Sequence, residues 1–101
     1  MSIHHLTITI SCQVVNYSSV KSIKTILISL VKQALKGLPG TIDFTNCSYI
    51  DVNKFTIELM ITTTITTNIV IAVNSYLSHY VPTEYTKDDV DIRRIRMSAS
   101  I

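Results

Sequence analysis

Charged residues, glycine, proline and cysteine are all scarce in this chain of 101 residues. Charged side chains make up 16% of the sequence and hydrophobic ones 47%, a balance that excludes an intrinsically disordered chain. Two cysteines, Cys12 and Cys47, are too few for a disulfide scaffold, and two glycines exclude a glycine-rich phosphate loop. The composition is typical of one small folded domain with apolar surface left over for a partner.

Long hydrophobic runs are missing as well. The most apolar stretch, residues 62–81, is interrupted by polar side chains, so we expect no membrane-spanning segment and no membrane partner. The N-terminal residues alternate between polar and apolar types without a basic start, which argues against a signal peptide. The formal net charge of +2 is too small to attract nucleic acid in general. We therefore expect a cytoplasmic protein whose two cysteines are structural thiols.

The hydrophobic periodicity predicts three strands and two helices. A period of two indicates strands at residues 5–14, 41–52 and 55–62, of which the second is irregular and calls for a bulge. A period near 3.6 indicates helices at residues 20–36 and 67–80. The order β-α-β-β-α predicts an α+β, ferredoxin-like two-layer sandwich, with an antiparallel sheet and both helices on one face.

The last part of the chain is predicted separately. Residues 1–82 are expected to form the single domain, and residues 83–101 a charged tail after Pro82. Apolar and basic residues alternate at the end of this tail, which predicts an optional final strand at the edge of the sheet.

Residues that could carry catalysis or hold a metal do not form a recognisable pattern. His4 and His5 are adjacent in a strand, so their side chains point to opposite faces and cannot bind one ion together. The acidic residues Asp88, Asp89 and Asp91 lack the glycine-containing spacing of a calcium loop. We therefore predict no enzyme activity, no cofactor and no metal.

The first predicted helix has an unusually wide apolar face. Its apolar side chains span roughly 200°, whereas a single packed face needs about 100°. Ile28 and Leu35 lie at the margin of this arc. One interpretation is that the margin docks a larger subunit. The other is that the two helices and the irregular second strand bury the whole arc within the domain.

The first predicted strand suggests a dimer contact. If the final strand is absent, this strand has an open edge, and a long regular edge favours pairing with another copy. The residues expected at that edge are Leu6, Ile8, Thr9 and Ile10.

Two segments resemble a known family. The run Ala72-Val73-Asn74-Ser75-Tyr76-Leu77, together with the hairpin at residues 51–59, is similar to the small dimerisation subunit of the KEOPS complex, which is grouped with the CTAG antigens. Val70 stands where that family usually has an arginine, and Pro82 ends a helix that usually continues. A divergent archaeal paralogue of the subunit is therefore the alternative identity.

The resemblance implies a non-catalytic scaffold role in threonylcarbamoyladenosine modification of transfer RNA. The chemistry would belong to a large ATP-binding threonylcarbamoyl-transferase subunit. This chain would dimerise with itself or a paralogue, dock its helices on the large subunit and help to hold transfer RNA. The docking residues expected are Ile28, Leu35, Val73, Asn74, Tyr76 and Leu77, and the residues expected to contact transfer RNA are Arg93, Arg94 and Arg96.

Two other functions compete with this one. A small ferredoxin-like ligand-binding or regulatory module would act as a homo-oligomer, but its glycine-rich strand–helix loop is missing at residues 15–19. An acylphosphatase-type enzyme would need an arginine and an asparagine placed for phosphate, and no segment marks such a site.

Overall fold

The computed structural model describes residues 1–17, 19–65, 68–87 and 89–101. Thr67, at which the second helix was expected to begin, and Asp88 of the acidic loop lie outside these ranges. The described elements are, in order, β1 (Ser2–Asn16), α1 (Val20–Ala34), β2 (Thr41–Asp51), β3 (Lys54–Thr63), α2 (Ile69–Tyr80), β4 (Tyr85–Lys87) and β5 (Val90–Ser100).

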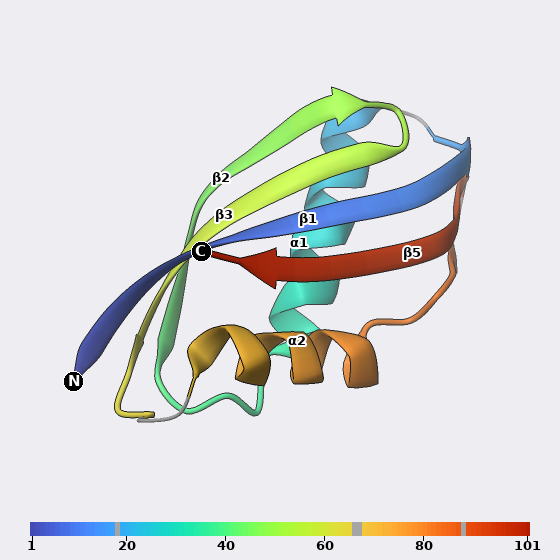
Figure 1. Ribbon diagram of the computed structural model, residues 1–101. Helices are drawn as coiled ribbons and strands as arrows, with labels where there is room; N and C mark the ends of the chain where they lie inside the picture. Colours follow the sequence, from blue (N-terminus) through green and yellow to red (C-terminus); the bar gives the residue numbers. More distant parts are fainter. Residues whose placement is uncertain (18, 66–67, 88) are drawn as a thin grey trace.

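The strands form one antiparallel sheet in the order β2-β3-β1-β5-β4 (Figure 1). The arrangement is the predicted α+β, ferredoxin-like two-layer sandwich, to which the short β4 adds a fifth strand at one edge. The predicted tail, residues 83–101, contains two strands of this sheet, β4 and β5. β5 is an interior strand rather than an edge strand, because β1 pairs with one side of it and β4 with part of the other.

One hydrophobic core lies between the sheet and the two helices. The alternation in β1 places Leu6, Ile8 and Ile10 in this core, at 2% exposure or less. Both helices contribute buried side chains at helical spacing, namely Ile23, Leu27, Val31 and Ala34 from α1, and Ile69, Val73 and Leu77 from α2. The opposite face of the sheet carries many polar side chains, such as the exposed Thr9 and Ser98.

Side-chain caps fix where the two helices begin, and a glycine allows the turn that follows α1. The Ser19 hydroxyl accepts a hydrogen bond from the Ser22 amide at 3.1 Å and caps α1, and the Asn68 side chain caps α2 in the same way. α1 ends at Ala34, two residues before the predicted end. After it, Gly40 has a φ of 118°, and a Cβ there would lie 2.2 Å from the Thr62 carbonyl oxygen, so only glycine fits.

The predicted irregularity of the second strand is confirmed. β2 loses register with β3 between Phe44 and Asn46 and again near its end. The tight turn that follows is held by Asn53, whose amide donates to Asp51 at 2.8 Å. The Asn53 carbonyl accepts from the Cys12 amide at 3.0 Å, which ties the hairpin to β1.

Candidate functional site

The predicted dimer edge at Leu6, Ile8, Thr9 and Ile10 is wrong from Ile8 to Ile10, because β5 pairs with β1 from Thr7 onward. Thr9 lies between Thr56 of β3 and Ser98 of β5, and the other three side chains point into the core. The prediction assumed that no final strand was present. The structure forms that strand because the alternating apolar residues of β5 complete the same core as those of β1.

Three of the predicted docking residues belong to the core. Leu35 is 1% exposed, Val73 is fully buried and Leu77 is 2% exposed, so none of them can contact a partner. Leu35 follows the last helical turn, and its backbone amide donates to the Val31 carbonyl at 2.9 Å. Ile28 is half-buried and packs against the same core. The centre of the apolar arc is therefore buried within the domain, whereas Val20, Ile26, Ile28 and Leu30 are only half-buried. The second interpretation of the sequence holds for part of the arc.

Asn74 also has a structural role rather than the predicted docking role. Its side-chain oxygen accepts from the Ala99 amide at 2.8 Å, and its side-chain nitrogen donates to the Ala99 carbonyl at 3.0 Å. The same nitrogen donates to the Val70 carbonyl at 3.0 Å. Asn74 thus pairs with the backbone of β5 as a strand would, and it fixes α2 against that strand.

The outward side of α2 is the best candidate docking surface. We define the α2 outer face as Ile71, Ser75, Ser78, His79 and Tyr80, all of which are exposed. Ile71 is 68% exposed and Tyr80 is 60% exposed. None of the twelve residues of α2 is Asp, Glu, Lys or Arg. The sequence signal for this surface is the lack of charge in residues 69–80.

Aromatic rings give one end of this face a defined shape. Tyr76, the remaining predicted docking residue, is half-buried and stacks on Tyr80 with ring centroids 5.9 Å apart. His79 meets Tyr80 edge-on at 5.3 Å. Ser75 and these three rings line a shallow hollow of about 320 Å³. Of the predicted docking residues, the structure thus leaves Tyr76 and part of Ile28 within reach of a partner.

The three arginines of β5 are exposed but differ in surroundings. Arg93 forms an ion pair with Asp91 at 3.1 Å, which raises the pKa of the Arg93 guanidinium, first by hydrogen bonding and then by charge attraction. Arg94 is the extra residue of a bulge and has a positive φ of 52°. This bulge places Arg93 opposite Gln13 and Arg96 opposite Ser11, so both pair with residues of the exposed sheet face.

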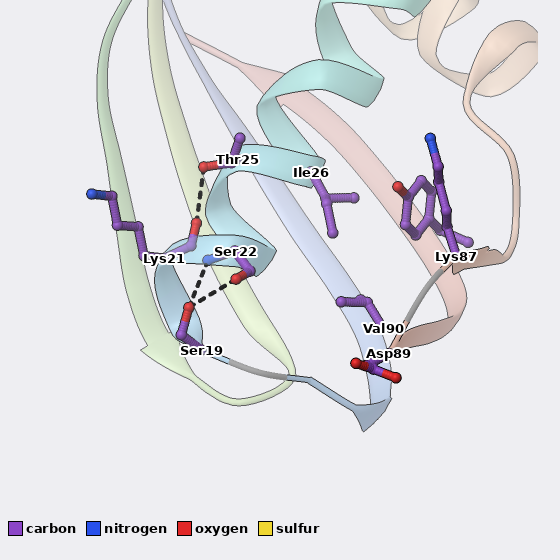
Figure 2. Close-up of a pocket in the computed structure, with 9 residues that line it drawn as sticks. Ser19, Lys21, Ser22, Thr25, Ile26, Lys87, Asp89 and Val90 are labelled. Atoms are coloured by element: carbon purple, nitrogen blue, oxygen red, sulfur yellow. Dashed lines mark hydrogen bonds between the residues drawn. The ribbon is translucent and has the colours of Figure 1, made fainter.

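A larger hollow lies at the start of α1 and has a volume of about 530 Å³. Figure 2 shows that the polar side chains there are engaged along α1: Ser19 with Ser22, and the Thr25 hydroxyl with the Lys21 carbonyl at 3.0 Å. Lys21 and Lys87 lie on opposite sides of this view, so their charges do not converge (Figure 2). In the described part of the chain, no three His, Cys, Asp or Glu residues gather where they could hold a metal ion.

Both cysteines are free thiols. Burial raises the pKa of the Cys12 thiol, and the nearby Asp51 carboxylate raises it further. Burial also raises the pKa of Cys47, against a smaller opposing effect of Lys24. Both thiols are therefore poor nucleophiles at neutral pH.

None of the described helices is long and apolar enough to cross a membrane.

Comparison with protein-family models, curated proteins and solved structures finds no match for this chain.

Proposed function

We propose that this protein is a non-catalytic scaffold subunit, resembling the small subunit of the KEOPS complex, that supports threonylcarbamoyladenosine modification of transfer RNA in the cytoplasm. The observation that carries the docking part of this proposal is the uncharged α2 outer face. The identity of the partner, a large ATP-binding threonylcarbamoyl-transferase subunit, rests on the family resemblance of residues 51–59 and 72–77.

The α2 outer face has the composition of a protein interface core. Such cores are depleted in charged residues and enriched in aromatic ones. Ile71 supplies a large exposed anchor, and the small hydroxyl side chains of Ser75 and Ser78 on the same side of the helix allow a partner to approach closely. Tyr80 is a second exposed anchor at the end of the helix, about half a turn around its axis from Ile71.

The face is also held rigidly, which lowers the entropy cost of binding. The Asn68 side chain accepts from the amides of Val70 and Ile71 at 3.0 and 3.4 Å and fixes the first turn. Asn74 fixes the middle of the helix to β5. The outward side of α1 differs, because the charged Lys21 and Lys32 lie on it in solvent, with Lys36 just after its end.

The docking proposal predicts that charge on α2 prevents binding. Ile71→Asp and Tyr80→Asp place a carboxylate at exposed positions, so we expect the domain to stay folded. Their affinity for the purified large subunit, measured by calorimetry, should fall by about tenfold or more, since anchor residues contribute at least about 2 kcal/mol.

Ser29→Asp is the matched control, since it adds the same charge to an exposed position on α1. It should bind as the unmodified chain does. If the unmodified chain does not bind the large subunit, or if the α2 variants bind normally, the proposed docking face is incorrect.

The part of the proposal that concerns transfer RNA predicts a change in salt dependence. Replacing Arg93, Arg94 and Arg96 together by Gln should weaken transfer RNA binding by the assembled complex. Asp91 already neutralises Arg93, so the slope of log affinity against log salt should fall by roughly two rather than three.

A variant with Lys21, Lys32 and Lys36 changed to Gln loses the same charge from α1 and the residues just after it, and it serves as the control. An equal effect of both triple variants would indicate a general charge effect. An unchanged slope in the arginine variant would remove these residues from RNA binding.

A further inference from the structure

The outer side of β5 is engaged at two positions, with a gap between them. At one position the Asn74 side chain pairs with the N–H and C=O of Ala99, at 2.8 and 3.0 Å. At the other the Ile95 amide donates to the Thr83 carbonyl at 2.9 Å. β4 pairs only with residues 90–92 of β5, so among the described residues no strand covers this side of β5 beyond Ile95.

The backbone groups in this gap belong to Met97. Ile95 and Ala99 direct their N–H groups to the outer side of β5, and the register with β1 runs without a shift from Arg96 to Ser100. Alternate residues of a strand direct their N–H and C=O to the same side, so those of Met97 face outward as well. Within the described part of the chain, neither group has a hydrogen-bond partner. Met97 therefore presents a free donor and a free acceptor side by side.

A hollow of about 290 Å³ lies beside this part of β5, where α2 runs next to the strand (Figure 1). Its lining comes from Leu77, Ser78 and Val81 at the end of α2, from Thr83, and from residues 95–97. Val81 is half-buried, so the hollow offers apolar surface near the polar backbone groups. Ser78 belongs to the α2 outer face, so the hollow is continuous with the proposed docking surface.

Asn74 shows which chemical group fits such a pair. Its carboxamide is planar, carries an acceptor and a donor next to each other, and bonds both backbone groups of Ala99 at once. A carboxylate would accept from the Met97 N–H but would repel the Met97 C=O, whereas an ammonium or guanidinium group has no acceptor for the N–H. Of the polar groups that protein side chains carry, the carboxamide matches Met97 best.

We propose that the Met97 site, meaning its outward N–H and C=O with the hollow beside them, binds a carboxamide from an Asn or Gln side chain of the docking partner. The carboxamide pairs with Met97 as Asn74 pairs with Ala99, two residues further along β5. The source of the carboxamide rests on the proposed function. The site itself rests only on the geometry of β5 and α2.

The surroundings of Met97 suit such a side chain. Its aliphatic part covers the apolar surface of Val81. The Ser78 hydroxyl donates to the Ser75 carbonyl at 3.1 Å, so its oxygen can still accept a hydrogen bond from the ligand. Arg96 also lines the hollow and would attract a carboxylate, so the test compares the two chemistries directly.

The first measurement uses the chain alone with isobutyramide, a small carboxamide with an aliphatic end. Isobutyrate and methyl isobutyrate have nearly the same shape but lack its N–H donor. In an NMR titration we expect isobutyramide to shift the Met97 amide signal saturably and to bind about fivefold more tightly than either control, as one additional hydrogen bond predicts. No shift, equal binding of the three compounds, or tighter binding of isobutyrate would overturn the carboxamide site.

Two variants with the same added ring test the position of the probe. Ser78→Trp covers the hollow from an exposed position, so we expect isobutyramide binding to be lost. Ser29→Trp places the same ring at an exposed position of α1 that does not line the hollow, and it should bind as the unmodified chain does. If Ser78→Trp binds isobutyramide as Ser29→Trp does, the probe lies elsewhere and the site is incorrect.

A second measurement tests the source of the carboxamide. In the complex with the purified large subunit, hydrogen exchange of the Met97 amide should slow by about tenfold or more, because the N–H then bonds the partner. Binding to the α2 outer face without this protection would show that the partner does not supply the carboxamide. If the large subunit does not bind at all, the proposed function and this source both fail, and the isobutyramide titration alone decides the Met97 site.

Discussion

Leu35→Asp is expected to leave the protein unfolded at neutral pH. Leu35 is 1% exposed and belongs to the core. Truncating a buried leucine costs about 2–5 kcal/mol, and the carboxylate adds the cost of an unpaired buried charge. The whole free energy of unfolding of a domain is about 5–15 kcal/mol, so little would remain. Far-ultraviolet circular dichroism and thermal unfolding would measure the loss.

Ile28→Asp is the control for Leu35→Asp. Both residues lie at the margin of the apolar arc of α1, yet Ile28 is only half-buried. We expect Ile28→Asp to remain folded, with a lower midpoint of thermal unfolding. If Leu35→Asp were as stable as Ile28→Asp, the placement of Leu35 in the core would be incorrect, and a docking role for it would be open again.

Asn74→Leu is expected to be the second most damaging change. Leucine has a similar volume but leaves the N–H and C=O of Ala99 without their partner. Each buried backbone group left unpaired costs about 1–3 kcal/mol. We expect a large fall in the denaturant concentration at half-unfolding and faster hydrogen exchange of the Ala99 amide, because β5 loses its attachment to α2.

Ser75→Ala is the control for Asn74→Leu. Ser75 is the next residue along α2 and is exposed, so its substitution should change the free energy of unfolding by no more than about 0.5 kcal/mol. A stable Asn74→Leu variant that had lost only partner binding would instead support the docking role that the family resemblance implied for Asn74.

Part of the candidate site could be predicted from the sequence. The lack of charge along α2 is visible in residues 69–80, and it identifies a surface fit for a partner. The choice of Leu35, Val73 and Leu77 as docking residues failed. Apolar residues at helical spacing look the same whether they face the protein's own core or a partner.

The sequence by itself determined the fold class and the elements from β1 to α2, whereas β4 was not predicted and β5 was predicted only as an optional edge strand. Alternation with period two located β1 and β3, the interrupted alternation of β2 predicted its bulge, and Pro82 marked the end of α2. Local burial periodicity is a property of short segments, so it can be recognised without knowing the neighbours of a segment.

Only the tertiary structure decided which strand edges are open and which polar groups are engaged. The pairing of β1 with β5 joins residues about ninety positions apart, such as Thr9 and Ser98, and it closes one edge while leaving residues 2–6 uncovered. The bond between Asn74 and Ala99 likewise depends on where α2 lies against β5. Such contacts depend on the length and register of distant strands, which no local pattern in the chain specifies.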